Sequence, residues 1–136
     1  MNRSPRSRDR HATPDAGEPQ PRRPVVKPKI TPTRLRIVAG ELGGRKIDYN
    51  GDPATRPMKE RTRESVFSLL GGYLYNTFAI DLFGGTGILA FESISRGADR
   101  AIILEMSRPA VTTMLESMRQ LGLSDRIDVF NVDTLR

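Results

Sequence analysis

The stretch IDLFGGTGILAFESISRGA, residues 80–98, decides the fold class of this chain. An apolar run typical of a β-strand reaches Asp81, and three glycines follow within four positions, at Gly84, Gly85 and Gly87. A helical pattern then begins. Because glycine adopts positive φ angles and leaves the backbone open to close approach, we expect either a ligand or a tightly packed element to lie against this turn.

The sequence around the turn alternates strands with helices. Strands are expected over 77–83, 100–105 and 127–132, and helices over 86–96 and 107–121. The second helix has an apolar stripe that is expected to face the core, consisting of Val111, Met114, Leu115, Met118 and Leu121. Strands and helices that alternate at this spacing indicate parallel pairing and right-handed crossovers. The predicted fold class is therefore α/β, with a Rossmann-like sheet.

Two further elements are expected before this unit. Residues 35–49 predict a β-hairpin that turns at Gly43-Gly44. A helix is expected to begin at Pro57 and to end at Gly71-Gly72. Its apolar stripe would be Val66, Phe67, Leu69 and Leu70, and its solvated charged face Lys59, Glu60, Arg61, Arg63 and Glu64.

The positive charge is concentrated at the N-terminus. Residues 1–34 hold nine Lys or Arg against three Asp or Glu, with seven of the ten prolines and no aromatic residue. Such a segment buries too little apolar surface to offset its ordering entropy, so a disordered basic tail is expected over 1–34. It would either attach to nucleic acid or act as a plain solvated tail. The predicted organisation is this tail, a hairpin and helix over 35–76, and a ligand-binding domain over 77–136.

Composition also excludes several classes of protein. The chain contains no cysteine, so disulfides, cysteine-ligated zinc and thiol catalysis are ruled out. No apolar run approaches the roughly 20 residues that span a membrane, and the N-terminus lacks the apolar core of a secretory signal. We therefore expect a cytoplasmic protein with neither a membrane nor a metal partner.

Polar groups mark the carboxyl end of each predicted strand, where open α/β sheets bind their ligands. Asp81 and the glycine turn follow the first strand, Glu105 ends the second, and Asp133 follows the third. Glu105 lies 18 residues beyond Gly87, a spacing that suits a carboxylate accepting from ribose hydroxyls. Asp133 can accept from the exocyclic amine of adenine, and Asp81 can hold the turn or face a cationic group.

Three nucleotide ligands and one purely structural role compete for the glycine turn. A P-loop needs a lysine after the glycines, and none follows here. A dinucleotide fingerprint, GxGxxA, is present at 85–90. The spacing acid-x-x-x-Gly-x-Gly at 81–87 is typical of S-adenosylmethionine sites, and a sulfonium explains an acid so near the turn. The structural alternative is a turn needed only for close packing between strand and helix.

Four segments in this order resemble one bacterial family: RIVAGELGGRK (36–46), TRPMKERTRESVFSLL (55–70), DLFGGTGILAFESISRGA (81–98) and ILEMSRPA (103–110). They are similar to the RsmD-type enzymes, which methylate a guanine exocyclic amine in small-subunit ribosomal RNA. The resemblance implies S-adenosylmethionine as methyl donor and a seven-stranded sheet of order 3-2-1-4-5-7-6. It implies a cofactor site made of Asp81, Phe83, Gly84, Gly85, Thr86, Gly87, Glu105, Met106 and Asp133, and an RNA-facing set of Arg36, Arg45, Lys46, Arg56 and Arg61.

The chain departs from the family pattern in two places. The family usually has Ala-Gly-Ser-Gly at the turn, whereas this chain has Gly84 at the alanine position, which is not expected to abolish binding. The family's catalytic Asp/Asn-Pro-Pro-Phe/Tyr motif is absent, because no Pro-Pro pair occurs in the 136 residues. We therefore predict no catalytic residue and expect a fragment or truncated product of a longer enzyme. The strand at 77–83 should then form an exposed apolar edge, so the chain alone is expected to aggregate or fold only partly.

The leading hypothesis is an RNA methyltransferase, or its cofactor-binding portion, whose partner is ribosomal RNA or the small ribosomal subunit. The full-length enzyme is expected to be a monomer. The alternatives are part of a DNA adenine methyltransferase, a non-catalytic nucleic-acid-binding module and an NAD-binding fragment. The basic hairpin is equally compatible with RNA contact and with a plain cap on the sheet.

Overall fold

The computed structural model describes residues 33–136. The tail predicted over 1–34 therefore lies outside the described residues, except for Thr33 and Arg34, which belong to the first strand. The elements follow in the order β1 (Thr33–Arg36), β2 (Lys46–Tyr49), α1 (Glu60–Leu69), β3 (Phe78–Asp81), α2 (Ile88–Ser95), β4 (Arg100–Glu105), α3 (Arg108–Leu121) and β5 (Ile127–Asn131).

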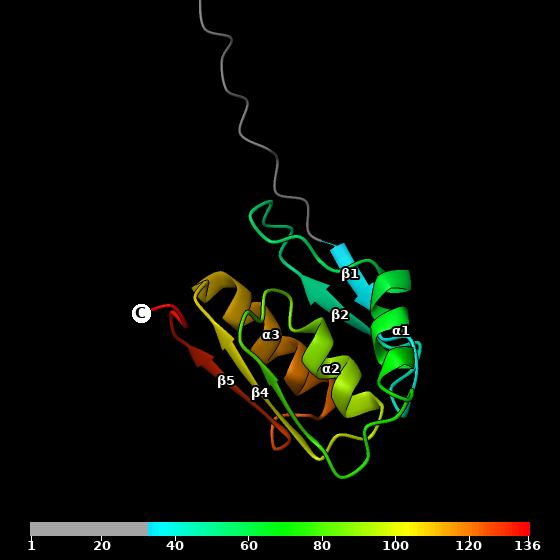
Figure 1. Cartoon of the computed structure of the whole chain (residues 1–136). Helices are drawn as coiled ribbons and strands as arrows, with labels where there is room; N and C mark the ends of the chain where they lie inside the picture. The colour runs from blue at the N-terminus through cyan, green and yellow to red at the C-terminus, as the bar shows by residue number, and fades with distance from the viewer. Residues whose placement is uncertain (1–32) are drawn as a thin grey trace, which may run out of the picture.

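These elements form three layers (Figure 1). The first layer is a parallel sheet of order β3-β4-β5, as the alternation of strands and helices predicted. Helices α2 and α3 cover one face of this sheet. The antiparallel hairpin β1-β2 packs on the other side of the helices, with β2 against α3. The hairpin is thus separated from the sheet by the helix layer.

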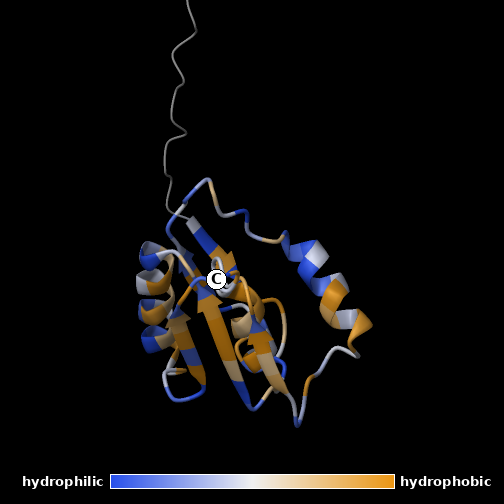
Figure 2. Cartoon of the chain, turned by 60° about the vertical axis from the view of Figure 1, so that its left-hand side comes forward, coloured by the Kyte–Doolittle hydropathy of each residue, from blue (hydrophilic) through white to orange (hydrophobic). Residues whose placement is uncertain are grey.

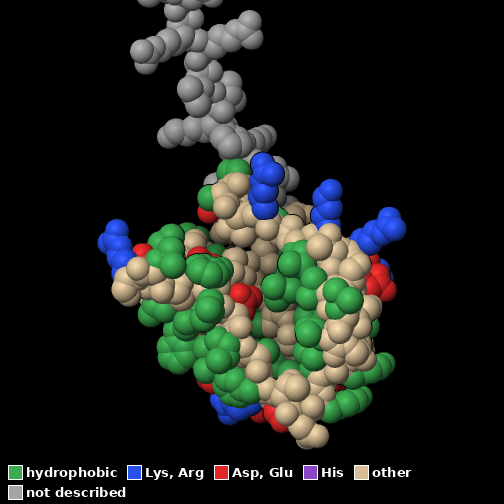
Figure 3. Space-filling view, in the orientation of Figure 1, with side chains coloured by type: hydrophobic (Ala, Val, Ile, Leu, Met, Phe, Trp, Pro, Cys, Tyr) green, Lys and Arg blue, Asp and Glu red, His purple; other side chains and the backbone are tan. Residues whose placement is uncertain are grey.

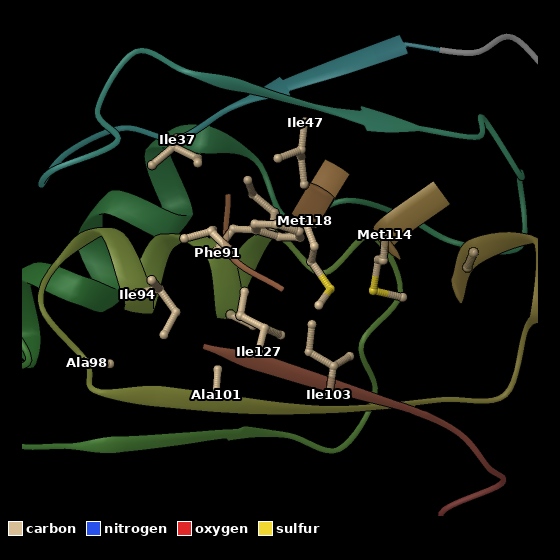
Figure 4. Close-up of a cluster of buried hydrophobic side chains, with 14 residues drawn as sticks. Ile37, Ile47, Phe91, Ile94, Ala98, Ala101, Ile103, Met114, Met118 and Ile127 are labelled. Atoms are coloured by element: carbon tan, nitrogen blue, oxygen red, sulfur yellow. The ribbon is translucent and has the colours of Figure 1, made fainter. Parts of the chain in front are cut away.

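A single hydrophobic core joins the three layers (Figure 4). Ile37 and Ile47 enter it from the hairpin segment, and Ile103 and Ile127 enter it from the sheet. The helices fill the space between them with side chains that include Phe91, which is fully buried. The hairpin therefore shares its apolar contacts with the body of the chain.

The burial predicted for the apolar stripe of α3 is confirmed at its two methionines and is wrong at Leu115. Met114 and Met118 are buried between the hairpin and the sheet, as expected. Leu115 is 47% exposed, because it lies beyond the width of the stripe that the other layers cover. The bounds of α3 agree with the helix predicted over 107–121, because Ser107 is its N-cap and Gly122 is its left-handed C-cap.

The other face of the parallel sheet carries exposed apolar side chains. Phe78, Ile80 and Leu82 are each at least half exposed, and β3 pairs only with β4 among the described strands. Figure 2 shows the strands of this sheet coloured mostly as hydrophobic. The prediction that the strand over 77–83 forms an exposed apolar edge is therefore confirmed for residues 33–136.

Helix α1 differs from its prediction in both its start and its faces. It begins at Glu60 after an N-cap at Lys59, so Pro57 precedes the helix instead of opening it. Arg63, expected in solvent, is 1% exposed, whereas Leu69 and Leu70 of the predicted apolar stripe are 89% and 59% exposed. The reason is that α1 meets the body through Arg63 and through Phe67 of the predicted stripe, which are both buried, whereas no described element covers Leu69 and Leu70 (Figure 1).

That buried contact is a cluster of two arginines on one carboxylate. Glu92 of α2 is fully buried and accepts from Arg96 Nε at 2.9 Å, while Arg63 Nε lies 3.5 Å from its other oxygen. The same carboxylate accepts from the backbone N–H groups of Val38 at 2.9 Å and Ala39 at 3.1 Å. Burial of Arg63 is tolerated because the ion is paired and hydrogen-bonded.

No helix within residues 33–136 is long and apolar enough to cross a membrane. Over the same residues, no three His, Asp or Glu side chains gather in a way that could hold a metal ion.

Candidate functional site

A cleft of about 530 Å³ opens at the carboxyl ends of β3 and β4. The glycine turn and the end of β4 form one wall, and a loop over 52–58 forms the other. Figure 3 shows this face hollowed at its centre, with Asp and Glu side chains in the hollow and Lys and Arg side chains along its upper margin. The sequence-predicted residues that line the cleft are Asp81, Phe83, Gly84, Gly85, Thr86, Glu105, Met106 and Arg56.

Glu105 joins the glycine turn to the segment after β4. One of its carboxylate oxygens accepts from the backbone N–H of Gly85 at 2.6 Å, and the other accepts from the N–H of Ser107 at 2.7 Å. A carboxylate has about four acceptor sites, so each oxygen can accept a further hydrogen bond. Glu105 is therefore held in a fixed orientation at the cleft wall with acceptor capacity to spare.

The three glycines of the turn have different reasons to be glycine. A Cβ on Gly84 would stand 2.2 Å from Cγ2 of Ile103, and a Cβ on Gly87 would stand 2.8 Å from Sδ of Met114. Both positions are thus filled by the protein's own core, and both Gly85 and Gly87 have a positive φ. A Cβ on Gly85 would meet Thr55 of the opposite wall at 3.2 Å. Close packing, the structural alternative for the turn, therefore explains Gly84 and Gly87. Only Gly85 faces across the cleft.

Asp81 lies beside Glu105 in the cleft. Its carboxylate accepts from the N–H of Phe83 at 3.1 Å, which fixes the start of the turn. Burial raises the pKa of Asp81 above its usual range, and the neighbouring charge of Glu105 raises it further. Two carboxylates placed together in this way favour a ligand group that carries positive charge.

A smaller hollow of about 130 Å³ adjoins the cleft and contains Asp133. Phe83, Glu105 and Met106 line both spaces. The rings and thioether of Phe83 and Met106 are largely exposed, at 67% and 68%, and so offer apolar contact area. Asp133 accepts from the N–H of Leu135 at 3.0 Å and lies 3.5 Å from Arg136 Nε. The fold thus brings Asp133 next to the residues after the first two strands, as the sequence predicted.

Two of the predicted residues act mainly within the chain. The hydroxyl of Thr86 accepts from the N–H of Ile88 at 3.3 Å, which satisfies a donor in the first turn of α2. Gly87 is the left-handed N-cap of α2 and does not line the cleft within the described residues.

Sequence reasoning missed the wall formed by the loop over 52–58. The hydroxyl of Tyr49, at the end of β2, lies 2.6 Å from the carbonyl oxygen of Asp52 and 2.7 Å from that of Thr55. Burial raises the pKa of this tyrosine. Its anchoring role has no signature in the sequence, because a hairpin tyrosine is usually a packing residue.

The five residues predicted to face RNA do not form one group. Arg56 lines the cleft, while Arg36 and Lys46 line a separate groove at the hairpin. Arg45 and Arg61 are exposed and lie outside both spaces.

Residues 35–136 match the model of a family described as conserved hypothetical protein 95. The chain belongs to this family. Two similar proteins are named ribosomal RNA small subunit methyltransferase D. The one from Buchnera aphidicola is 32% identical over 104 residues, which cover 76% of this chain and 51% of the relative. The one from Escherichia coli K12 is 32% identical over 88 residues, which cover 65% of this chain and 44% of the relative. The chain thus spans about half the length of the curated relatives it matches.

Solved structures share the fold of this chain. The Escherichia coli protein yhhF, a methyltransferase by name, superposes with a TM-score of 0.68 at 27% identity, covering 76% of this chain and 55% of that one. The Thermus thermophilus protein TTHA0928 superposes with a TM-score of 0.60 at 26% identity, covering 72% and 55%. The expected Rossmann-like methyltransferase fold and the resemblance to the RsmD-type family are confirmed.

Proposed function

We propose that this chain supplies the S-adenosylmethionine-binding part of a ribosomal RNA methyltransferase. The observation that carries the proposal is the carboxylate of Glu105, which bridges the N–H groups of Gly85 and Ser107 at a cleft that also contains Asp81. The names of the relatives support ribosomal RNA of the small subunit as the substrate class. A guanine exocyclic amine is the acceptor that we propose from the resemblance to the RsmD-type family.

The residues present suit such a cofactor. The free acceptor sites of Glu105 would take the two ribose hydroxyls, and Asp133 would accept from the adenine amine. Phe83 and Met106 would give apolar contact to the adenine ring, since they line both the cleft and the adjoining hollow. Asp81 would face the cationic end of the molecule, where its charge is stabilised.

The bound cofactor would supply an electrophilic methyl group on a sulfonium. The contribution of this chain is then positioning, which lowers the barrier by fixing the geometry of the reacting groups. Tyr49 at the end of β2 would keep the loop over 52–58 in place as the wall opposite the turn at Gly85, because its hydroxyl lies within hydrogen-bond distance of two carbonyl oxygens of that loop. We assign no residue of this chain to proton transfer from the target amine.

In this proposal residues 77–136 hold the cofactor, and the hairpin and α1 over 35–76 face the RNA. Arg56 is the link between the two, because it is exposed at the cleft itself. An NAD-binding function, compatible with the GxGxxA pattern at 85–90, is disfavoured because two carboxylates at the turn would repel a pyrophosphate.

The test is a calorimetric titration of the full chain with S-adenosylmethionine. The proposal expects saturable binding that Glu105→Gln weakens by about tenfold or more, since hydrogen bonds to a charged group contribute about 1.5–3 kcal/mol. Glu116→Gln, an exposed acid on α3, is the matched control and should bind like the wild type. A folded chain that binds no S-adenosylmethionine, or that binds NAD instead, would contradict the proposal.

A further inference from the structure

A second groove, of about 480 Å³, lies between the hairpin and the start of α1. Its charged lining residues are one carboxylate, Glu60, and five positively charged side chains: Arg34, Arg36, Lys46, Lys59 and Arg63. Glu60 is already bonded to Arg36, whose Nε lies 3.2 Å from it. The chain has only four lysines, and the two within residues 33–136 both line this groove. The groove therefore concentrates positive charge from both strands of the hairpin and from the start of α1.

The buried cluster beside the groove adds to this charge. Arg63 and Arg96 share the one carboxylate of Glu92, so the cluster of two cations and one anion has a net positive charge. Arg63 Nε also has no hydrogen-bond partner among the described residues, although it is buried. Uncompensated charge under a surface is costly, and a negatively charged ligand in the groove would offset it.

The groove and the cofactor cleft share a wall. Pro57 and Met58 line both spaces, so a ligand in the groove lies across that wall from one in the cleft. The N-terminus of α1 opens onto the groove, and Lys59 at its N-cap makes no side-chain capping bond. Backbone N–H groups at a helix start favour anions, which adds to the effect of the side chains.

We propose that this groove holds the phosphodiester backbone of a single RNA strand and delivers it over Pro57 and Met58 to the cofactor cleft. The cations are spread along β1, β2 and α1 over a volume much larger than one phosphate, which fits a strand better than a single anion. The identity of the strand as RNA rests on the proposed function. The groove extends the predicted RNA-facing set by Arg34, Lys59 and Arg63, and it leaves out Arg45, Arg56 and Arg61.

The first test compares two matched arginines in the full chain. Arg34 and Arg100 are both about half exposed or more, and each is paired with an aspartate, at 3.3 Å to Asp48 and 2.8 Å to Asp128. Binding of a fluorescent single-stranded RNA is measured by anisotropy across a range of salt concentrations. Arg34→Gln should weaken binding severalfold and reduce the slope of log K against log salt by about 0.7. Arg100→Gln should leave both unchanged, and equal effects of the two variants would overturn the groove.

The second test uses the reactivity of the lysines. RNA should protect Lys46 and Lys59 from acetylation in the wild-type chain, with the degree of modification at each lysine read by mass spectrometry. Unprotected Lys46 and Lys59 at saturating RNA would overturn the proposal. Protection by inorganic phosphate at the same phosphate concentration would overturn the assignment to a strand.

Titration with S-adenosylmethionine separates this proposal from the proposed function. Arg34→Gln and Lys59→Gln should bind the cofactor as the wild type does, since neither residue lines the cleft. Intact cofactor binding with no effect of the groove variants on RNA would refute the groove alone. Absence of S-adenosylmethionine binding in the wild-type chain would instead contradict the proposed function.

Discussion

Ile103 occupies the space that a side chain at Gly84 would need. Its γ2 methyl group stands 2.2 Å from the position of a Cβ on Gly84, well inside contact distance. The RsmD-type pattern has alanine at this position, and the side chain of Ile103 on β4 gives a steric reason for glycine here. The φ angle of Gly84 is not positive, so the constraint comes from packing and not from the backbone.

Gly84→Ala should therefore lower the free energy of unfolding by about 1–3 kcal/mol, the usual cost of overpacking a core. Ile103→Leu removes the γ2 branch while keeping the volume, so the double variant Gly84→Ala/Ile103→Leu should recover part of that loss. Urea unfolding of the four proteins gives the coupling energy. Strictly additive effects would show that the two residues do not compete for space.

Glu92→Gln should be among the most destabilising single changes in this chain. It leaves Arg63 and Arg96 buried without a counter-charge, which typically costs about 3–5 kcal/mol. The free energy of unfolding in urea is the measurement, and Glu64→Gln, an exposed acid on α1, is the control with an expected change within about 0.5 kcal/mol. A cost for Glu92→Gln below about 1 kcal/mol would mean that the cluster is not a unit.

Tyr49→Phe should loosen the loop over 52–58 without unfolding the chain. The variant loses the hydroxyl that lies within hydrogen-bond distance of two carbonyl oxygens, a change of about 1 kcal/mol. Hydrogen exchange should speed up in this loop, and the affinity for S-adenosylmethionine should fall severalfold. Tyr73→Phe, which removes the hydroxyl of an exposed tyrosine, is the control. Unchanged exchange in the loop of Tyr49→Phe would show that the anchor is unimportant.

If the proposed function holds, the raised pKa of Asp81 should make the binding of S-adenosylmethionine depend on pH. A cationic ligand prefers the ionised carboxylate, so affinity should fall as pH falls through the raised pKa. Calorimetry over a pH series measures this, and binding should be accompanied by proton release. Asp81→Asn should bind more weakly and lose that part of the pH dependence. A pH profile shared by the variant and the wild type would remove Asp81 from the site.

The raised pKa of Asp81 also determines how the stability of the folded chain changes with pH. Because the pKa of Asp81 is higher in the folded than in the unfolded chain, the folded state binds the proton more tightly. Its contribution to stability is therefore present below the unfolded pKa, near 3.9, and is lost as pH rises through the folded value. Without ligand, Asp81→Asn should consequently be more stable than the wild type at neutral pH, as thermal unfolding would report.

The sequence predicted best where periodicity and strand ends coincide. The parallel sheet and the positions of Asp81, Glu105 and Asp133 follow from the alternation of elements, because the carboxyl ends of parallel strands share one edge. Once the end of each strand is predicted correctly, the position of these three residues at that edge follows.

Predictions failed where a residue's surroundings come from elsewhere in the chain. Arg63 looks like part of a solvated helix face, and only the distant Glu92 makes its burial possible. Leu69 matches a helical stripe, yet no element covers it among the described residues. The loop over 52–58 becomes a cleft wall through the hydroxyl of Tyr49, a contact that no local pattern encodes.

The docking of the hairpin on the helices has a consequence for the order of folding. Val38 bonds to Glu92 across 54 residues of chain, and Asp48 bonds to Ser117 across 69. At a synthesis rate of about 5–20 residues per second, the hairpin would leave the ribosome ~3–14 s before its partners exist. Until then Ile37 and Ile47 have no layer to cover them. The hairpin is therefore synthesised first but is among the last elements to pack in the folded chain.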